Sequence, residues 1–388
     1  MDFTIPDEYK MMQQMARRFM EDEIYPLEKE IDETDRVPMD EWRRLVAQAV
    51  ELGLWAPFVP EKWGGGGIQS TICNVMLSEE FGKGPLVFAL FFLNGSLSDL
   101  DSASDYLKEQ YLLPHIRGEK FFAGAFTEPT TGGSDQSAML TTAKKDGDNW
   151  VINGSKTFIS GADFADFFML AARTALDKPR GGVTQFFVDK DQPGLKIGRE
   201  QKTLGNRGLT QYEIYFDDCI VPDANRAGAP GGGMAGWMRM IVVPRLRVAA
   251  WGVGGAQRCF ELGINWAKER VTFGKPLSYR QAIQWMVVDS WAEILSTRLF
   301  LHNTAWRLDQ GEDVLAEAGM CKVMGSELGQ RVSDRVIQIY GGHGYTNDFP
   351  MERIWRDQRG CRIYEGANEI LHYLAARKLL DVPSMINQ

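Results

Sequence analysis

The hydrophobic periodicity of the chain changes twice along its 388 residues, and this limits the possible folds more than any other feature. Apolar residues recur at helical spacing before residue 120 and again after residue 236, whereas short β-rich runs between turn residues fill the intervening region. A doubly wound nucleotide-binding fold requires strands and helices that alternate, so this order argues against it. The length favours two or three packed subdomains.

The two outer regions are predicted to be helical. Near the N-terminus, an apolar series recurs at helical spacing, and we expect its methionines to pack in the core. This series is Met11, Met12, Met15, Phe19 and Ile24. In the C-terminal region, the candidate helices cover about residues 237–270, 278–310, 312–341 and 366–380.

The middle region is predicted to form a compact β-barrel or sandwich, because its β-rich runs are short and separated by turns such as Asn153-Gly154. The runs are residues 121–126, 150–152, 167–170, 184–188 and 212–216. The predicted fold class is therefore α+β and mainly helical. The predicted domains are an N-terminal helical domain (1–120), a middle β-domain (121–235) and a C-terminal helical domain that forms a four-helix bundle (236–388).

Charge and hydropathy argue against several kinds of partner. The net charge is −9 and the basic residues are scattered, so we expect no nucleic-acid partner. No segment approaches the roughly 20 apolar residues that span a bilayer, so we expect no membrane association. The N-terminus lacks the basic start and apolar centre of a signal peptide. The expected location is therefore the cytoplasm of a bacterium, or the mitochondrial matrix for a processed form.

The cysteines and histidines do not indicate a metal site. The five cysteines are far apart and form no CxxC pair, and the four histidines form no HExxH motif. We expect reduced, mostly buried thiols and no bound metal.

One glycine-rich segment must be tested as a dinucleotide fingerprint. Residues 231–236 fit GxGxxG, but Pro222 and Pro230 occupy the approach where a strand is required. The position about twenty residues further on, near Ala256, is not acidic. We interpret the segment as a connector or a loop near a ligand, and a nicotinamide-binding Rossmann enzyme is rejected.

Three other segments are polar and rich in glycine. Residues 127–135 (TEPTTGGSD) follow a predicted strand and expose backbone N–H groups that suit a heterocycle or a phosphate. Residues 270–276 (RVTFGKP) end a predicted helix and pair a cation with an aromatic ring. Residues 338–345 (QIYGGHGY) precede the RIWRD run at 353–357 and the IYEGANEI run at 363–370.

Together and in this order, the three segments and residues 153–156 (NGSK) closely resemble the acyl-CoA dehydrogenase family, from about residue 7 to residue 380. The resemblance implies an N-terminal helical domain, a middle β-domain and a C-terminal helical domain. It also implies a homotetramer, with FAD bound partly across a subunit interface.

The resemblance assigns residues to FAD in three groups. It places Phe126, Thr127, Gly133 and Ser134 beside the flavin ring, with Phe158 and Ser160 on the other side. It gives the pyrophosphate and adenine half to Arg270, Phe273 and Gln281, with Gln338 and Gly342 reaching it from a neighbouring subunit. A guanidinium suits phosphate oxygens, and glycine permits close backbone approach. Ala367 and Glu369 complete the predicted cofactor contacts.

The resemblance also implies the reaction. In this family a carboxylate removes the α-proton of an acyl-CoA and the β-hydride passes to the flavin, which leaves a trans-2-enoyl thioester. Glu365 matches the base, and burial against the substrate is expected to raise its pKa. Some members carry the base directly before a helix arginine that matches Arg245, but Pro244 stands there and cannot act. The residues assigned to the substrate are Ser134, Val242, Arg245, Tyr364 and Gly366, whereas Arg247 is interpreted as structural.

The chain departs from the family pattern at a few positions. The TEP…GSD loop has one extra residue, Phe158 stands where tryptophan is frequent, and Ala367 replaces a frequent threonine. The last change removes a hydrogen bond that contributes about 1 kcal/mol. Trp251 either reshapes the substrate pocket or packs between helices. None of these changes removes a catalytic group.

Three alternative functions remain beside a dehydrogenase that passes electrons to an electron-transfer flavoprotein. An acyl-CoA oxidase would use oxygen, but typical oxidases carry an additional C-terminal domain for which 388 residues leave no room. An enoyl-CoA reductase would run the same chemistry in the opposite direction. A non-catalytic scaffold would be expected to lose the base or the flavin motifs, whereas Glu365 and Arg270 are both present.

Overall fold

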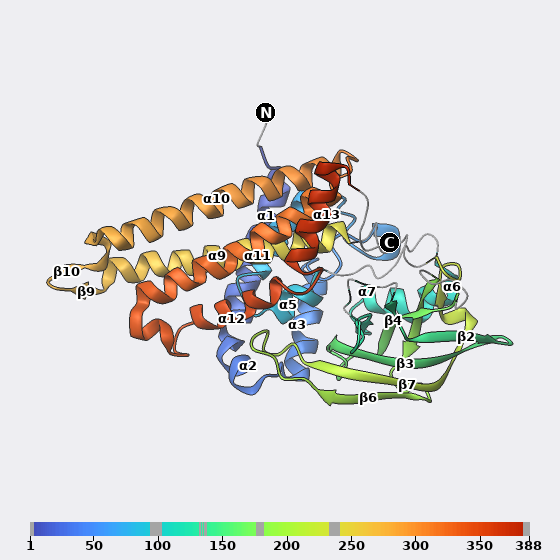
Figure 1. Cartoon of the computed structure of the whole chain (residues 1–388). Helices are drawn as coiled ribbons and strands as arrows, with labels where there is room; N and C mark the ends of the chain where they lie inside the picture. Colours follow the sequence, from blue (N-terminus) through green and yellow to red (C-terminus); the bar gives the residue numbers. More distant parts are fainter. Residues whose placement is uncertain are drawn as a thin grey trace.

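The computed structural model describes residues 4–93, 103–131, 133, 135, 138–175, 182–232 and 241–382. Helices form both ends of the chain and a β-sheet lies between them in sequence, as predicted (Figure 1). The N-terminal helices pack against both other parts, because one hydrophobic cluster joins Trp42 to Phe167 of the sheet and Trp251 of the C-terminal region.

The N-terminal helices surround an aromatic core. Trp42 contacts Phe88 at 5.9 Å and Phe92 at 5.7 Å between ring centroids. The elements are α1 (Asp7–Phe19), η1 (Met20–Ile24), η2 (Tyr25–Leu27), α2 (Glu28–Thr34), α3 (Met39–Glu51), η3 (Glu61–Trp63), α4 (Thr71–Phe81), α5 (Leu86–Phe91), α6 (Asp105–Leu107), η4 (Lys108–Leu112) and α7 (Leu113–Ile116).

The core prediction for the N-terminal methionines is correct for two of the three residues. Met12 and Met15 pack against the core, on the same side of α1 as the buried Phe19. Met11 is 70% exposed, so its predicted core position is wrong. Its side chain points about 100° around the helix from that of Met12, away from the stripe formed by residues 12, 15 and 19.

The middle region forms one eight-stranded sheet with the order β6-β7-β3-β2-β4-β5-β8, and β1 pairs in parallel with β4. The longest ladder is antiparallel and joins β3 to β7. The strands are β1 (Phe122–Ala125), β2 (Thr142–Asp146), β3 (Asn149–Ser160), β4 (Phe167–Arg173), β5 (Val183–Asp189), β6 (Leu195–Glu200), β7 (Gln211–Pro222) and β8 (Arg226–Ala227); a short 3₁₀ turn, η6 (Asp223–Asn225), precedes β8.

Within residues 241–382, the C-terminal region has three long helices and two shorter ones. The elements are α9 (Val242–Glu269), the hairpin β9 (Val271–Thr272) and β10 (Lys275–Pro276), η7 (Leu277–Tyr279), α10 (Gln281–Asp309), α11 (Leu315–Tyr340), η8 (Gly341–Tyr345), α12 (Met351–Cys361) and α13 (Asn368–Leu380). Four of the helices match the predicted ones, although the predicted start of the first at residue 237 lies outside the described residues.

Helix α12 was not predicted from the sequence. Its inward side carries Arg353 and Asp357, which are 4% and 2% exposed, so charged residues take the place of part of the apolar stripe. The two side chains bond each other at 2.6 Å, and Arg353 also bonds Glu28 of α2 at 2.9 Å. Asp357 accepts the backbone N–H of Asn206, in the loop between β6 and β7, at 2.5 Å. The helix therefore ties all three parts of the chain together.

Glycines allow α9 and α11 to touch through their backbones. A Cβ atom on Gly252 of α9 would lie 2.0 Å from the carbonyl oxygen of Gly325 on α11, which no side chain can accept without moving the helices. Each helix therefore needs glycine at this crossing.

All five cysteines are buried and free, as predicted. Within the described parts of the chain, none of the helices is both long and apolar enough to cross a bilayer.

Candidate active site

Glu365 lies in the short loop between α12 and α13, and its backbone has an unusual conformation. Its φ is 55°, in the left-handed region, and the φ of the following Gly366 is 92°. Left-handed backbone is unfavourable for a residue with a Cβ atom, so the loop must be held by its surroundings. The backbone N–H of Tyr364 bonds the carbonyl of Gly360 at 3.3 Å, and Asn368 closes the loop by bonding the carbonyl of Arg362 at 3.2 Å.

Three cations act on the partly buried carboxylate of Glu365. Desolvation raises the pKa of Glu365 above its usual value, while Arg245 and Arg247 of α9 and Lys322 of α11 oppose the rise. The rise agrees with the direction expected from the sequence. The balance leaves a carboxyl group that takes up a proton more readily than a solvated one, yet remains ionisable.

Of these three cations, Arg245 makes the fewest hydrogen bonds to the described residues. Its side chain is 5% exposed, and its Nε is buried without a hydrogen-bond partner among the described residues. The guanidinium lies against the loop, because a Cβ atom on Gly366 would be 3.7 Å from its Nη2. Burial lowers the pKa of Arg245 and Glu365 raises it. A buried donor of this kind is suited to an oxygen atom of a ligand.

Arg247 and Trp251 of α9 pack next to the loop that carries Glu365. Arg247 donates to the carbonyls of Ala89 and Phe92 at 3.0 and 2.8 Å, at the C-terminal end of α5, which agrees with its structural interpretation. Trp251 is 3% exposed, and its ring meets that of Tyr364 edge-on at 6.4 Å. Trp251 therefore packs between helices, and it supports the loop that carries Glu365.

Four of the residues predicted to face the flavin ring meet at one edge of the sheet. The segment after β1 carries Phe126 and Thr127, and the end of β3 carries Phe158 and Ser160. The N–H of Thr157 donates to the carbonyl of Thr127 at 2.9 Å, which joins the two segments. Phe158 has a φ of 56° and is 59% exposed, so a large aromatic ring is presented to solvent beside the Thr127 loop.

A buried ion pair, to which sequence analysis gave no role, fixes this edge. Lys156 of β3 and Glu128 are 0% and 4% exposed, and their side chains are 2.9 Å apart. Lys156 also donates to the carbonyl of Phe126 at 3.0 Å, and Glu128 accepts the N–H of Leu140 at 2.6 Å. Burial lowers the pKa of Lys156 to about 8. Both residues stand in the quoted motifs, but their contact joins positions far apart in sequence.

The residues predicted to bind the distal half of FAD lie at the other end of the molecule. Figure 1 shows the hairpin β9–β10, which carries Phe273, opposite the sheet. Phe273 is 97% exposed, and Arg270 is exposed with its Cζ 6.0 Å from the ring of Trp266. Trp266 stacks on Tyr340 at 4.5 Å, so Gln338 in the last turn of α11 and Gly342 in the following η8 lie at the same end. Gln281, at the start of α10, is also exposed.

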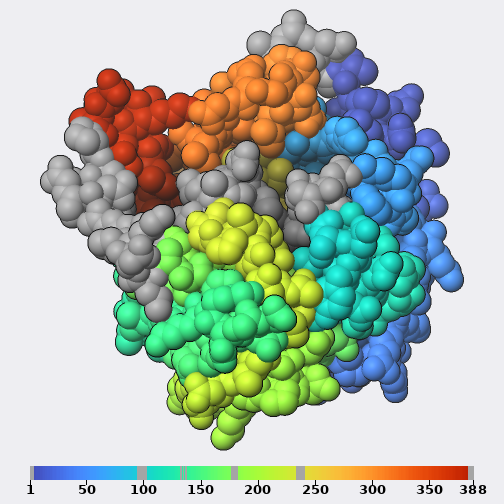
Figure 2. Space-filling model, turned by 90° about the vertical axis from the view of Figure 1, so that its right-hand side faces the viewer, coloured from blue at the N-terminus to red at the C-terminus, as the bar shows by residue number. Residues whose placement is uncertain are grey.

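The remaining predicted site residues that the structure describes lie at the starts of two C-terminal helices and beside the sheet. Val242 is the first residue of α9, Ala367 is the N-cap of α13, and Glu369 is exposed in the first turn of α13. Figure 2 shows α13, in red, on the same face of the molecule as the green strands. Gly133 is partly buried, whereas Ser134 lies outside the described residues.

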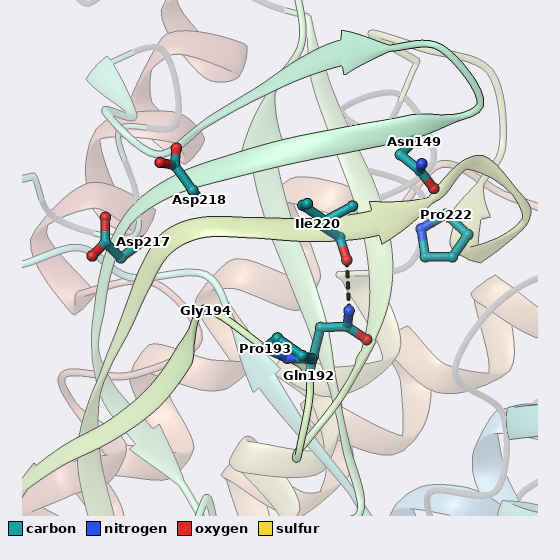
Figure 3. Close-up of a pocket in the computed structure, with 8 residues that line it drawn as sticks. All are labelled: Asn149, Gln192, Pro193, Gly194, Asp217, Asp218, Ile220 and Pro222. Atoms are coloured by element: carbon teal, nitrogen blue, oxygen red, sulfur yellow. Dashed lines mark hydrogen bonds between the residues drawn. The ribbon is translucent and has the colours of Figure 1, made fainter.

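A separate hollow on the sheet does not involve the predicted site (Figure 3). It lies beside β7, and a 2.6 Å hydrogen bond from the side chain of Gln192 to the carbonyl of Ile220 joins two of its lining residues. Its lining residues are Asn149, Gln192, Pro193, Gly194, Asp217, Asp218, Ile220 and Pro222. None of them belongs to the predicted catalytic or cofactor set.

Comparison with known proteins identifies the family. Models of the N-terminal, middle and C-terminal domains of acyl-CoA dehydrogenase match residues 6–119, 123–219 and 231–380. A short-chain-specific acyl-CoA dehydrogenase of Clostridium acetobutylicum is 34% identical, over 98% of this chain and 100% of its own. An NADH-dependent acryloyl-CoA reductase of Anaerotignum propionicum is also 34% identical, over 98% of this chain and 96% of its own.

A structural comparison agrees with the sequence comparisons. The solved structure of PigA with FAD and proline superposes with a TM-score of 0.90 at 28% identity, over 98% of this chain and 99% of the other. The chain therefore belongs to the acyl-CoA dehydrogenase family of oxidoreductases, which act on acyl-CoA and use FAD as their cofactor.

Proposed function

We propose that the protein carries out the α,β-dehydrogenation of an acyl-CoA thioester to the trans-2-enoyl-CoA, with Glu365 as the base that removes the α-proton. One observation supports this most directly: the carboxylate of Glu365 sits in a strained, left-handed loop with its pKa raised by burial. Strain and a raised carboxyl pKa are typical of a group selected for proton transfer, because neither stabilises the fold. The backbone N–H of Glu365 is the proposed donor to the thioester oxygen.

The residues at the sheet edge fit a planar flavin ring. Gly133 lies close to Thr127, since a Cβ atom on Gly133 would be 2.7 Å from the Thr127 Oγ1. Phe158 offers an exposed aromatic face. Thr127 and Ser160 would provide hydroxyl groups to the ring. FAD, when bound, supplies the acceptor for the hydride that leaves the β-carbon. The chain's own contribution is to hold the ring beside Glu365 and to remove the proton.

Both halves of the FAD site are proposed to come together only between two copies of the chain. The sheet-edge residues and the group around Arg270 and Phe273 lie at opposite ends of one chain (Figure 1). The family resemblance assigned only Gln338 and Gly342 to a neighbouring copy, but Arg270 lies at the same end of the chain as Gln338, because both border the stacked pair Trp266 and Tyr340. A second copy would therefore bring its own Arg270 together with its Gln338 to the flavin of the first, which is consistent with a homotetramer. One side of α10 supports such contacts, because it exposes a row of large apolar residues. The row is Trp285, Val288, Trp291, Leu295, Leu299 and Trp306.

A reductase that works on an enoyl-CoA is a second candidate, because an acryloyl-CoA reductase is as similar to the chain as the short-chain dehydrogenase. The same residues serve both directions, since Glu365 would then deliver a proton to the α-carbon. The proposed electron acceptor of the dehydrogenase is an electron-transfer flavoprotein, with oxygen as the alternative.

The pH dependence of the reaction is expected to reflect the raised pKa of Glu365. The base must be ionised to accept the α-proton, so kcat/KM should rise with pH until Glu365 is deprotonated. Because burial raises this pKa, the rising limb should lie above the ordinary range of a glutamate. Stopped-flow flavin reduction, from the lowest pH at which the protein keeps its flavin up to pH 9, measures the limb. A rising limb at or below the ordinary range of a glutamate carboxyl would contradict the raised pKa of Glu365.

The visible spectrum of the purified protein tests the function. The oxidised flavin band should bleach when saturated acyl-CoA thioesters are added without air, and the class that reacts defines the substrate range. Repeating the successful reaction in air separates an oxidase from a dehydrogenase. A flavin that no saturated thioester reduces would favour the reductase, and a protein that FAD cannot reconstitute would overturn the enzyme function.

A further inference from the structure

A fully buried lysine lies directly beneath the loop that carries Glu365. Lys322 of α11 is 0% exposed, and its Nζ donates to the carbonyl of Gly366 at 2.7 Å and to the Oδ1 of Asn368 at 3.0 Å. No ion pair of the described residues includes Lys322. Burying an ammonium group without a carboxylate partner is costly, so its retention calls for an explanation.

The next turn of α11 holds the rest of the loop. Ser326 accepts a hydrogen bond from the Nδ2 of Asn368 at 3.1 Å, and Glu327 accepts another from the same Nδ2 at 3.1 Å. Glu327 also pairs with Arg362 at 2.8 Å, on the other side of Glu365. Residues four and five apart on one helix thus fix both ends of the loop, which we name the α11 clamp (Lys322, Ser326 and Glu327).

The α11 clamp holds the loop next to the residue whose backbone conformation is unfavourable. Glu365 has a left-handed φ, and the carbonyl that Lys322 binds belongs to Gly366, the residue immediately after it. A hydrogen bond from a charged donor to that carbonyl is stronger than a neutral one and restrains the loop at the base itself. An error of about 1 Å in the position of a catalytic group can cost about 100-fold in rate, so this restraint matters to the reaction.

The charge of Lys322 acts on Glu365 as well. It opposes the rise in the pKa of Glu365, together with Arg245 and Arg247. Desolvation lowers the pKa of Lys322 to about 8, so the charge is present at pH values below about 8. At those pH values the ionised form of Glu365 is therefore favoured by a neighbouring cation.

We propose that Lys322 is a positioning residue for the reaction: it holds the loop of Glu365 through the Gly366 carbonyl, and its charge favours the ionised base. This inference rests on the proposed function, because it assigns Lys322 to the same proton transfer. The alternative is that Lys322 only stabilises the packing of α11 and α13. A packing role would change stability but not the pH at which the base ionises.

Two substitutions separate the two roles. Lys322→Gln keeps an amide donor for the Gly366 carbonyl and removes the charge, while Lys322→Met removes both. Lys378→Gln is the matched control, because Lys378 is a half-exposed lysine of α13 that pairs with Glu317 instead of the loop. Each variant is prepared with FAD, its flavin content and Tm are measured, and flavin reduction by a reactive acyl-CoA is followed from pH 5 to 9.

The expected results distinguish a failed inference from a failed function. In both Lys322 variants the rising pH limb should move to higher pH, since loss of a cation disfavours the carboxylate. Lys322→Met should also be slower at pH 7 by about 10- to 100-fold with little change in KM, and Lys322→Arg should restore the limb. Folded, flavin-loaded Lys322→Gln with the wild-type limb would overturn the inference. Wild-type protein that no thioester reduces, or Glu365→Gln that reacts normally, would instead overturn the proposed function.

Discussion

Replacing Glu365 with glutamine is expected to slow flavin reduction by an acyl-CoA about 10²- to 10⁴-fold. Glutamine is nearly the same size and keeps the loop, but its amide cannot accept the α-proton. The cations Arg245, Arg247 and Lys322 would then surround a neutral side chain, so binding of the thioester should persist. Anaerobic stopped-flow absorbance measures the rate, and titration of the flavin spectrum measures substrate binding.

The control for this variant is Glu51→Gln, because Glu51 is exposed at the end of α3 and far in sequence from every predicted site residue. It should reduce its flavin at the wild-type rate. If Glu365→Gln keeps more than about a tenth of the wild-type rate, the base must be another residue.

Replacing Lys156 with methionine is expected to lower the free energy of unfolding by about 3–5 kcal/mol. Methionine fills similar volume but leaves the buried carboxylate of Glu128 without its cation, and the carbonyl of Phe126 without its donor. The lysine holds the pKa of Glu128 below its usual value against the effect of burial, so its loss favours a protonated, weakly bonded acid. Denaturant unfolding of the holoprotein measures the change, and flavin release should accompany it.

Two comparison variants test whether the buried ion pair accounts for the loss in the free energy of unfolding. Lys145→Met removes a half-exposed lysine of β2 that pairs with Asp223, and should cost at most about 1 kcal/mol. Lys156→Met combined with Glu128→Gln removes both charges, so it should recover part of the stability lost in the single variant. If the single variant is as stable as the wild type, the pair does not hold the sheet edge.

The site residues proposed from the sequence stand in short local motifs, and the family resemblance assigned their roles. Glu365 stands next to Gly366, and Arg270 shares a short segment with Phe273, so their types and spacing are readable without a structure. The order of helices and strands was also predictable, because each region keeps one periodicity along its length.

Contacts between distant positions were not predictable in the same way. Lys322 is on α11 and its side chain binds the loop that follows α12. No sequence pattern at either position indicates that the two are in contact. Helix α12 was not predicted because its buried side includes the charged residues Arg353 and Asp357, which interrupt the apolar pattern of a buried helix face. The separation of Arg270 from the flavin-ring residues likewise depends on how long α9 is and where it points (Figure 1).

The backbone contact between Gly252 and Gly325 has a consequence for how such a protein can diversify. Arg245 lies about two turns before Gly252 on α9, and Lys322 lies about one turn before Gly325 on α11. The direct backbone contact between α9 and α11 thus fixes the spacing of these two charges around Glu365. Because both residues at the crossing are glycines, no side chain can be substituted there without moving the helices. Substitutions elsewhere in the bundle can reshape the space for an acyl chain while the charges around the base keep their places. Substrate range and proton-transfer geometry can then evolve independently of each other.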